Sequence, residues 1–118
     1  MSAHTTITAG VVAPAVVTLT ISSTGTVAVG AGLGNDFRLN LTKAAMMSNP
    51  AGGVDGQRIT VQITHSGGSL LWDSHYNFGT AGAPTLSATG KTDVLGFVYN
   101  AALAATSPWL CVGVALGF

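Results

Sequence analysis

Two stretches of the chain alternate strictly between apolar and polar residues. In residues 58–64, the apolar positions are Ile59, Val61 and Ile63. In residues 36–42, positions 37, 39 and 41 are apolar and the even positions are polar. Because successive side chains of a β-strand point to opposite faces, both stretches predict strands with one buried face. Asp55-Gly56 predicts a tight turn before the 58–64 strand, which we expect to pair in an antiparallel sheet.

Shorter segments extend this pattern on both sides. Residues 16–21 and the pair Val27 and Val29 flank the turn-forming residues 22–25, and together they predict a hairpin. Residues 69–72 predict a strand that a short glycine-containing turn joins to the preceding one. Residues 43–47 are long enough for one helical turn at most.

Two further segments, 94–99 and 109–116, are almost continuously apolar. Strands of this kind are typically covered on both faces, so we expect a core on one face and a neighbouring subunit on the other. The turn signals separate about seven or eight short strands, with no convincing helix. The predicted fold is all-β: an antiparallel β-sandwich, with a jelly roll as the favoured connectivity. Residues 1–15 are expected to form an N-terminal arm, and residues 16–118 a single β-sandwich domain.

The composition changes the expected surface. Of the 118 residues, 7% are charged and 47% are hydrophobic, whereas roughly 25% are charged in ordinary soluble domains. A thinly charged surface favours coverage by other subunits, so a homo-oligomer is expected. The four Lys and Arg residues balance the four acidic residues. They are too few to form a basic face, so no nucleic-acid partner is expected.

Residues 1–10 have no basic region followed by an apolar one, which a secretory signal would require. No apolar run approaches the length of about 20 residues that crosses a bilayer. We therefore expect no membrane partner, and assembly in a cytoplasm.

No group of residues predicts catalysis. Trp72-Asp73-Ser74-His75 contains the residue types of a hydrolytic triad, but neighbouring side chains on a strand end point in alternate directions and cannot converge. We favour a turn in which Asp73 and Ser74 bond backbone groups and Trp72 anchors a core or an interface. His4, His65, His75 and the lone Cys111 lack metal-ligand spacing, and the chain has no Glu. No enzymatic activity, cofactor or metal is expected.

A series of short motifs runs through residues 34–118 in a defined order. They are Asp36-Phe37-Arg38-Leu39, Asn49-Pro50, Val54 to Thr60, Trp72, Phe78, Ala83-Pro84-Thr85-Leu86, Gly90 to Asp93, Leu95 to Asn100 and Gly117-Phe118. With this order and spacing, the chain resembles a β-rich module of tailed-bacteriophage virion proteins. In that family the module occurs as capsid decoration (cement) proteins and as the end domain of longer tail-fibre or appendage proteins, typically in trimers.

The resemblance implies a virion structural protein without catalytic activity. The expected role is a homotrimer that binds the major capsid protein on the outer capsid surface, is assembled in the host cytoplasm and stabilises the head. The alternative is a tail-fibre or appendage receptor-binding module whose loop 73–83, with Trp72, Tyr76 and Phe78, stacks on host sugar. Only residues 1–33 precede the module, and they lack the repeats of a tail shaft, which favours the capsid. Residues 101–108 depart from the polar turn of the family.

Six residues are candidates for the capsid or subunit interface. They are Ile7, Val11, Val12, Phe97, Tyr99 and Trp109. The first three belong to an arm with too few apolar residues to hold to its own core, which suits strand addition to a neighbour. The other three belong to the two apolar runs.

Overall fold

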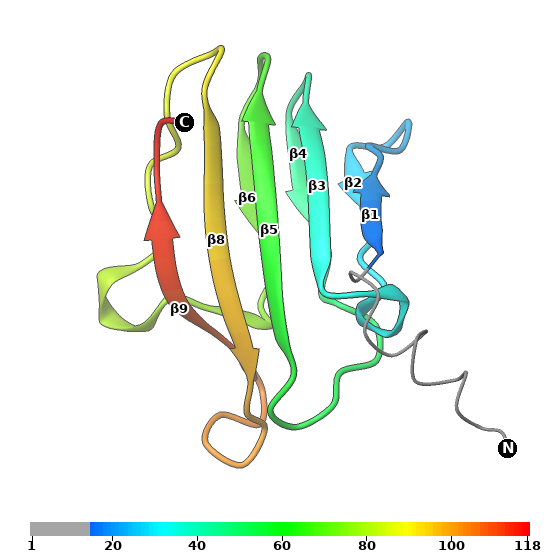
Figure 1. The fold of residues 1–118 in the computed structure, drawn as a ribbon, viewed down its shortest axis with the longest axis vertical. Coiled ribbons are helices and arrows are strands. Elements are labelled where there is room, and N and C mark those ends of the chain that lie inside the picture. Colours follow the sequence, from blue (N-terminus) through cyan, green and yellow to red (C-terminus); the bar gives the residue numbers. More distant parts are fainter. Residues whose placement is uncertain (1–14) are drawn as a thin grey trace, which may run out of the picture.

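A computed structural model describes residues 15–118 of the chain (Figure 1). These described residues are mostly β, with nine strands and two short 3-10 turns, which agrees with the predicted all-β class. The larger sheet has six strands in the order β1-β3-β5-β8-β9-β7. They are β1 (Val16–Leu19), β3 (Asp36–Leu41), β5 (Arg58–His65), β8 (Thr92–Tyr99), β9 (Trp109–Ala115) and β7 (Tyr76–Asn77). The smaller sheet has the order β2-β4-β6, with β2 (Thr26–Val27), β4 (Ala45–Met47) and β6 (Leu70–Trp72).

The first six strands wind in three coils between the two sheets. Each coil places one strand in the larger sheet and the next in the smaller sheet, which lies behind β1, β3 and β5 in Figure 1. Neighbouring coils pair in parallel, so that Val17 aligns with Phe37 and Phe37 with Val61. The corners of the coils also stack, since the Met46 amide donates to the Gly25 carbonyl and the Ala45 amide to the Ser69 carbonyl. We call β1 to β6 the coiled half.

The larger sheet is completed by antiparallel strands. β8 pairs antiparallel with β5, and β9 pairs antiparallel with β8. A register shift follows Gly96, opposite Val112 of β9. β7 pairs in parallel with β9, but only at Trp109 and Leu110. We call β7, β8 and β9 the antiparallel half; the 3-10 turns Ala31–Leu33 (η1) and Gly79–Ala81 (η2) lie in connections.

The core lies between the two sheets, and the alternating stretches supply most of it. Ile59, Val61 and Ile63 are 2%, 0% and 0% exposed, and Phe37, Leu39 and Leu41 are buried in the same way. Val27 and Met47 fill the core from the smaller sheet. Their polar neighbours face out, as the alternation predicts. The turn at Asp55-Gly56 is also confirmed, with Gly56 at φ +81° and the Gln57 amide donating to the Val54 carbonyl.

Several predictions of strand pairing are wrong. The antiparallel arrangement holds for β5–β8 and β8–β9, whereas β1–β3, β3–β5, β2–β4 and β4–β6 are parallel. An alternation with period two is the same in both kinds of pair, so it could not distinguish them. Neither the predicted antiparallel β-sandwich nor its jelly-roll connectivity is confirmed.

The two predicted hairpins are corners of the coils instead. The 22–25 turn forms, with the Gly25 amide donating to the Ser22 carbonyl, but it is followed by a single antiparallel bridge, Ile21 to Val27. β1 and β2 otherwise belong to different sheets, and β6 pairs with β4 rather than with β5. Residues 45–47 form strand β4 and not a helical turn. In each case a tight turn carries the chain to the other sheet, where the next apolar segment finds a parallel neighbour.

Candidate functional site

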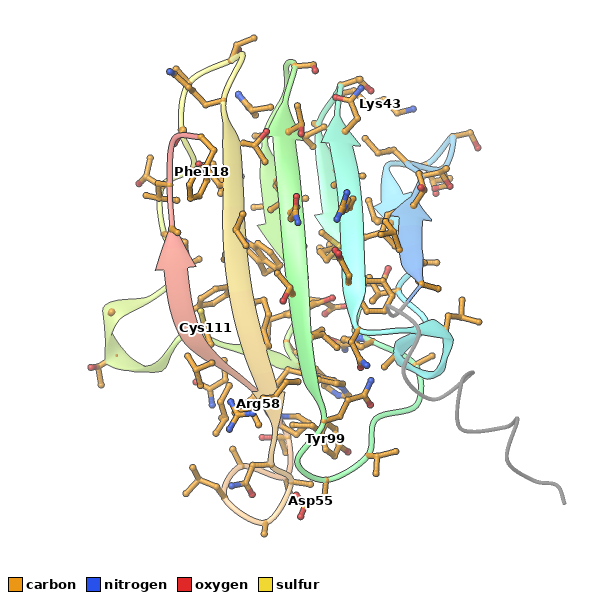
Figure 2. All side chains as sticks on the ribbon, in the orientation of Figure 1. Lys43, Asp55, Arg58, Tyr99, Cys111 and Phe118 are labelled. Atoms are coloured by element: carbon orange, nitrogen blue, oxygen red, sulfur yellow. The ribbon has the colours of Figure 1, made fainter. Side chains whose placement is uncertain are left out.

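The six predicted interface residues fall into three groups by their place in the structure. Ile7, Val11 and Val12 lie outside the described residues. Phe97 and Trp109 are 0% and 1% exposed and pack inside the chain's own core, so they offer no surface to a partner. Tyr99 is half-buried at the end of the sheet that also carries Asp55 and Arg58 (Figure 2). Its ring packs edge-on against Trp109, with the ring centroids 4.9 Å apart.

The outward face of the larger sheet changes from polar to apolar side chains between β5 and β8. On β3 and β5 this face carries polar side chains paired across strands: Asp36 with Thr60, Arg38 with Gln62, and Asn40 with Thr64. On β8 and β9 it carries Val94, Gly96, Val98, Leu110, Val112, Gly113 and Ala115. No charged side chain belongs to this second set. One half of the face is therefore suited to water and the other half to a partner.

The last strand leaves its apolar residues uncovered. All residues from Val112 to Phe118 are exposed. Val112 is 59%, Val114 is 44% and Leu116 is 48% exposed. Val112 points outward, because it lies beside Gly96 on the outer face. We call residues 111–118 the free edge of β9.

Sequence reasoning identified the run 109–116 as an interface segment but chose the wrong residue within it. It selected Trp109, and the register shift near Gly96 decides which later residues point outward. Such a bulge changes the facing of a strand and has no clear signature in a continuous apolar run. The signal that could have found the free edge was the lack of any charged residue after Asp93.

The 72–75 segment forms the predicted turn. The Asp73 carboxylate accepts a hydrogen bond from the Ser74 amide at 2.7 Å, and the Asn49 side chain accepts one from the His75 amide at 2.7 Å. The Asn49 amide group also donates to the Ser74 hydroxyl at 3.4 Å. These bonds hold the turn to the loop after β4.

The aromatic residues expected to stack on sugar pack on one another instead. Trp72, Tyr76 and Phe78 each lie within 5.7 Å of Phe97, measured between ring centroids, and Trp72 packs edge-on against Tyr76 and Phe78. Tyr76 is 6% exposed and its hydroxyl donates to the Ser48 carbonyl at 2.8 Å. Burial raises the pKa of Tyr76, and the nearby Asp73 raises it further. This cluster stabilises the junction between the two sheets and leaves no stack of free ring faces.

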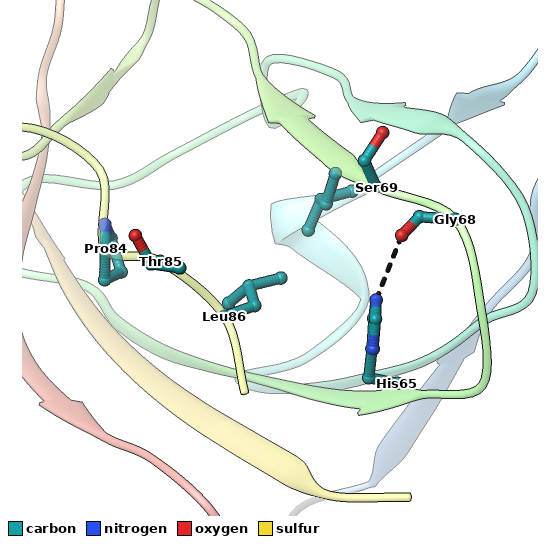
Figure 3. Close-up of a pocket in the computed structure, with 7 residues that line it drawn as sticks. His65, Gly68, Ser69, Pro84, Thr85 and Leu86 are labelled. Atoms are coloured by element: carbon teal, nitrogen blue, oxygen red, sulfur yellow. Dashed lines mark hydrogen bonds between the residues drawn. The ribbon is translucent and has the colours of Figure 1, made fainter. Parts of the chain in front are cut away.

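A shallow cleft of about 330 Å³ lies on the other side of the core, between the corner after β5 and the segment 84–86 (Figure 3). Its lining is His65, Gly68, Ser69, Leu70, Pro84, Thr85 and Leu86. His65 Nε2 lies 3.0 Å from the Gly68 carbonyl oxygen, and because a carbonyl only accepts, Nε2 carries the proton. His65 Nδ1 is buried without a hydrogen-bond partner among residues 15–118. Among the described residues, those that line the cleft include no carboxylate, lysine or arginine.

A buried carboxylate fastens the end of the chain to β8. Asp93 is 1% exposed and accepts hydrogen bonds from the Ser87 amide and hydroxyl, both at 2.6 Å, and from the Gly117 amide at 2.9 Å. Burial raises the pKa of Asp93, but these hydrogen bonds and the charge of His65 outweigh it, so the pKa lies below its ordinary value. Asp93 thus acts as a structural anchor for the free edge of β9.

Among residues 15–118, no group of three or more His, Cys, Asp or Glu side chains is placed to hold a metal ion. No helix in this part of the chain is both long and apolar enough to cross a membrane. Burial raises the pKa of the single thiol, Cys111, above its ordinary value.

Comparisons of the chain with protein-family models, with curated proteins and with solved structures found no match.

Proposed function

We propose that this chain is a decoration protein of a tailed-bacteriophage virion, which binds the major capsid protein on the outer capsid surface as a homotrimer. The motifs of residues 34–118 suggest the class of protein. The observation that carries the proposal is the exposed apolar surface of β9, which continues onto half-buried apolar residues on the outer face of β8, on a chain with 7% charged residues. A surface of this kind is stable in water when another protein covers it.

The proposed mechanism is the addition of buried area at joints between capsid subunits. Burial of apolar surface contributes about 25 cal/mol per Å², so an interface of roughly 800 Å² on each partner can supply many kcal/mol before the costs of association. The polar outward face of β3 and β5 would then remain in contact with water. Capsids that carry the chain should retain their genome at higher temperature and internal pressure than capsids that lack it.

The first test is to locate and count the chain in purified virions by quantitative mass spectrometry and electron microscopy. Hundreds of copies on the head are the expected result. A few copies at the tail would support the tail-fibre alternative, and absence from virions would overturn both. Capsids without the chain that break at the same temperature as complete capsids would exclude a stabilising role.

The second test concerns the surface. Val98→Lys places a charge on the apolar part of the outward face, and Thr60→Lys places the same charge on its polar part; both positions are half-buried. We expect Val98→Lys to weaken binding to undecorated capsids at least tenfold, while Thr60→Lys binds as the wild type does. Equal binding by all three proteins would show that this face does not contact the capsid.

A further inference from the structure

The side of β9 that faces away from β8 is open to another strand. β7 pairs with β9 only at Trp109 and Leu110, and beyond them β9 has no other strand partner on this side within residues 15–118. The free edge is extended as far as Ala115, Gly117 then has φ +84°, and Phe118 makes two 2.9 Å hydrogen bonds to Thr92 of β8. Natural proteins usually protect such an edge with charged residues or proline, and residues 109–118 contain neither. The edge is therefore an acceptor for β-strand addition.

The core side of the free edge is covered near Gly117 by the segment that carries Ser87, but it is open at Val114. Val114 lies opposite the buried Leu95 across the two strands, so it points toward the core side, yet it is 44% exposed. Figure 1 shows the reason: the smaller sheet lies behind β1, β3 and β5 and not behind β9. An added strand with one apolar face turned to this side would cover Val114 and Leu116.

We infer that the occupant of the free edge is the N-terminal segment, residues 4–12, of a second copy of this chain. Alternation along a strand would place Ile7, Ala9 and Val11 on one face, with Thr6 and Thr8 on the other. Residues 1–14 contain no charged side chain, as residues 109–118 contain none, so no charge would be buried in the pair. The rich supply of Thr and β-branched residues suits a strand.

The position of the segment favours a neighbouring copy over the chain's own edge. Residues 1–14 precede β1, which is at the opposite edge of the larger sheet from β7 and β9 (Figure 1). To reach its own free edge, the segment would have to cross a whole face of the sheet. In a head-to-tail arrangement, the β1 edge of one copy lies beside the free edge of the next. Such contacts close into a ring when the rotation between neighbouring copies allows it, and a rotation that closes after three copies would form the trimer of the proposed function, on which this inference builds.

The experiment uses one variant for each side of the contact. Ile7→Lys alters the inserted segment and Val114→Lys alters the free edge. Thr6→Lys and Leu103→Lys are the matched controls, because Thr6 would lie on the opposite strand face and Leu103 is 71% exposed in a loop distant in sequence from both. Oligomeric state is measured by analytical ultracentrifugation and light scattering over a hundredfold range of concentration, and folding by circular dichroism.

We expect the wild type and both controls to form trimers. Ile7→Lys and Val114→Lys should each need at least a tenfold higher concentration to associate. An equimolar mixture of the two should form a one-to-one heterodimer, because the intact segment of Val114→Lys can occupy the intact edge of Ile7→Lys. Pairing of two free edges, or insertion of the segment into its own edge, predicts no effect of Ile7→Lys and no heterodimer.

Any one of three results would overturn the inference. A monomeric wild type, an Ile7→Lys protein that remains trimeric, or a mixture without heterodimer each excludes it. If Val114→Lys fails to fold, Leu116→Lys replaces it at the edge, and deletion of residues 2–10 provides an independent variant of the segment. The location of the chain in virions is measured separately, so failure here leaves the proposed capsid role to its own test.

Discussion

The coiled half and the antiparallel half of this chain differ in how they bury their apolar side chains. In the coiled half, the long strands β3 and β5 present an apolar face to the opposite sheet and a polar face to water, as Phe37 and Arg38 show in adjacent positions. In the antiparallel half, β8 is apolar on both faces and β9 is exposed from Val112 onward. The coiled half leaves single apolar residues of β1, β4 and β6 exposed, namely Val16, Met46 and Leu71, whereas the antiparallel half leaves the end of β9 exposed as a continuous apolar run.

This difference separates the roles of stability and association within one sheet. The cross-strand pairs that stabilise a sheet are polar on the outer face of β3 and β5, where Thr, Gln and Asn meet water. On β8 and β9 the corresponding outer positions carry apolar side chains, which form no hydrogen bonds with water. We therefore expect core substitutions in either half to reduce stability, and outer-face substitutions in the antiparallel half to reduce association alone.

The largest expected effect lies where the halves meet. Phe97 belongs to β8, but its ring contacts Trp72 of the smaller sheet and Tyr76 of β7, and it is fully buried. Phe97→Ala should lower the free energy of unfolding by about 3–5 kcal/mol, because it leaves a cavity among these rings. Urea unfolding followed by tryptophan fluorescence measures it. A loss below about 1 kcal/mol would show that the two halves do not depend on this cluster.

The second effect is confined to the coiled half. Gly68 has φ +77°, and a Cβ there would lie 2.6 Å from the backbone nitrogen of Ala44, in the turn between β3 and β4. Gly68→Ala should therefore cost about 2–4 kcal/mol from backbone strain and overlap. Gly67→Ala is the control, since its Cβ would meet the Thr42 oxygen at 3.5 Å, an ordinary contact, without positive φ. Thermal unfolding of the two variants should differ clearly, and equal melting temperatures would show that the coil corner can shift.

The coiled half also shows which parts of the fold the hydrophobic pattern of the sequence can predict. Its long strands, β3 and β5, and their buried faces follow from alternation alone. The coil itself is also visible in retrospect, because each amphipathic strand is followed by a short turn and then by an apolar segment of two or three residues. Alternation could not supply the direction of pairing, and the turn signals after residues 21 and 65 are typical of hairpin loops as well as of corners between sheets. The segments β2, β4 and β6 are too short to reveal a period of two.

The candidate site was less predictable than the fold. The excess of apolar residues in 94–99 and 109–116 predicts a surface for a neighbouring subunit, and in the structure apolar residues are exposed along 112–118 but not along 94–99. This excess did not indicate which side chains form the surface. Phe97 is enclosed by Trp72 and Phe78, and Trp109 lies against Gly53, so both are buried by residues from elsewhere in the chain. Such contacts between residues distant in sequence depend on the fold. The resemblance to virion proteins remains a hypothesis about function.

A smaller effect concerns the anchor of the free edge. Asp93→Asn removes an acceptor facing the Ser87 and Gly117 donors and should cost about 2 kcal/mol at pH 7. Because the pKa of Asp93 is lowered on folding, its ionised form stabilises the fold above the unfolded value of about 4, and this contribution is lost as the pH falls through the folded pKa. Urea unfolding of both proteins at pH 7 and pH 3 should show the difference between them shrinking. A constant difference would mean that the charge of Asp93 does not contribute.

The smallest effect gives the sharpest comparison, because one chemical change is made at two positions. Val61 is fully buried in the coiled half and Val112 is 59% exposed in the antiparallel half. Val61→Thr should cost about 1–3 kcal/mol, since its hydroxyl is buried where apolar side chains surround it. Val112→Thr should change the free energy of unfolding by less than about 0.5 kcal/mol, as is usual for surface positions. Both are measured by urea unfolding below the concentration of association. A large loss in Val112→Thr would show that β9 contributes to the stability of the single chain, and its apolar surface would then need no partner to account for it.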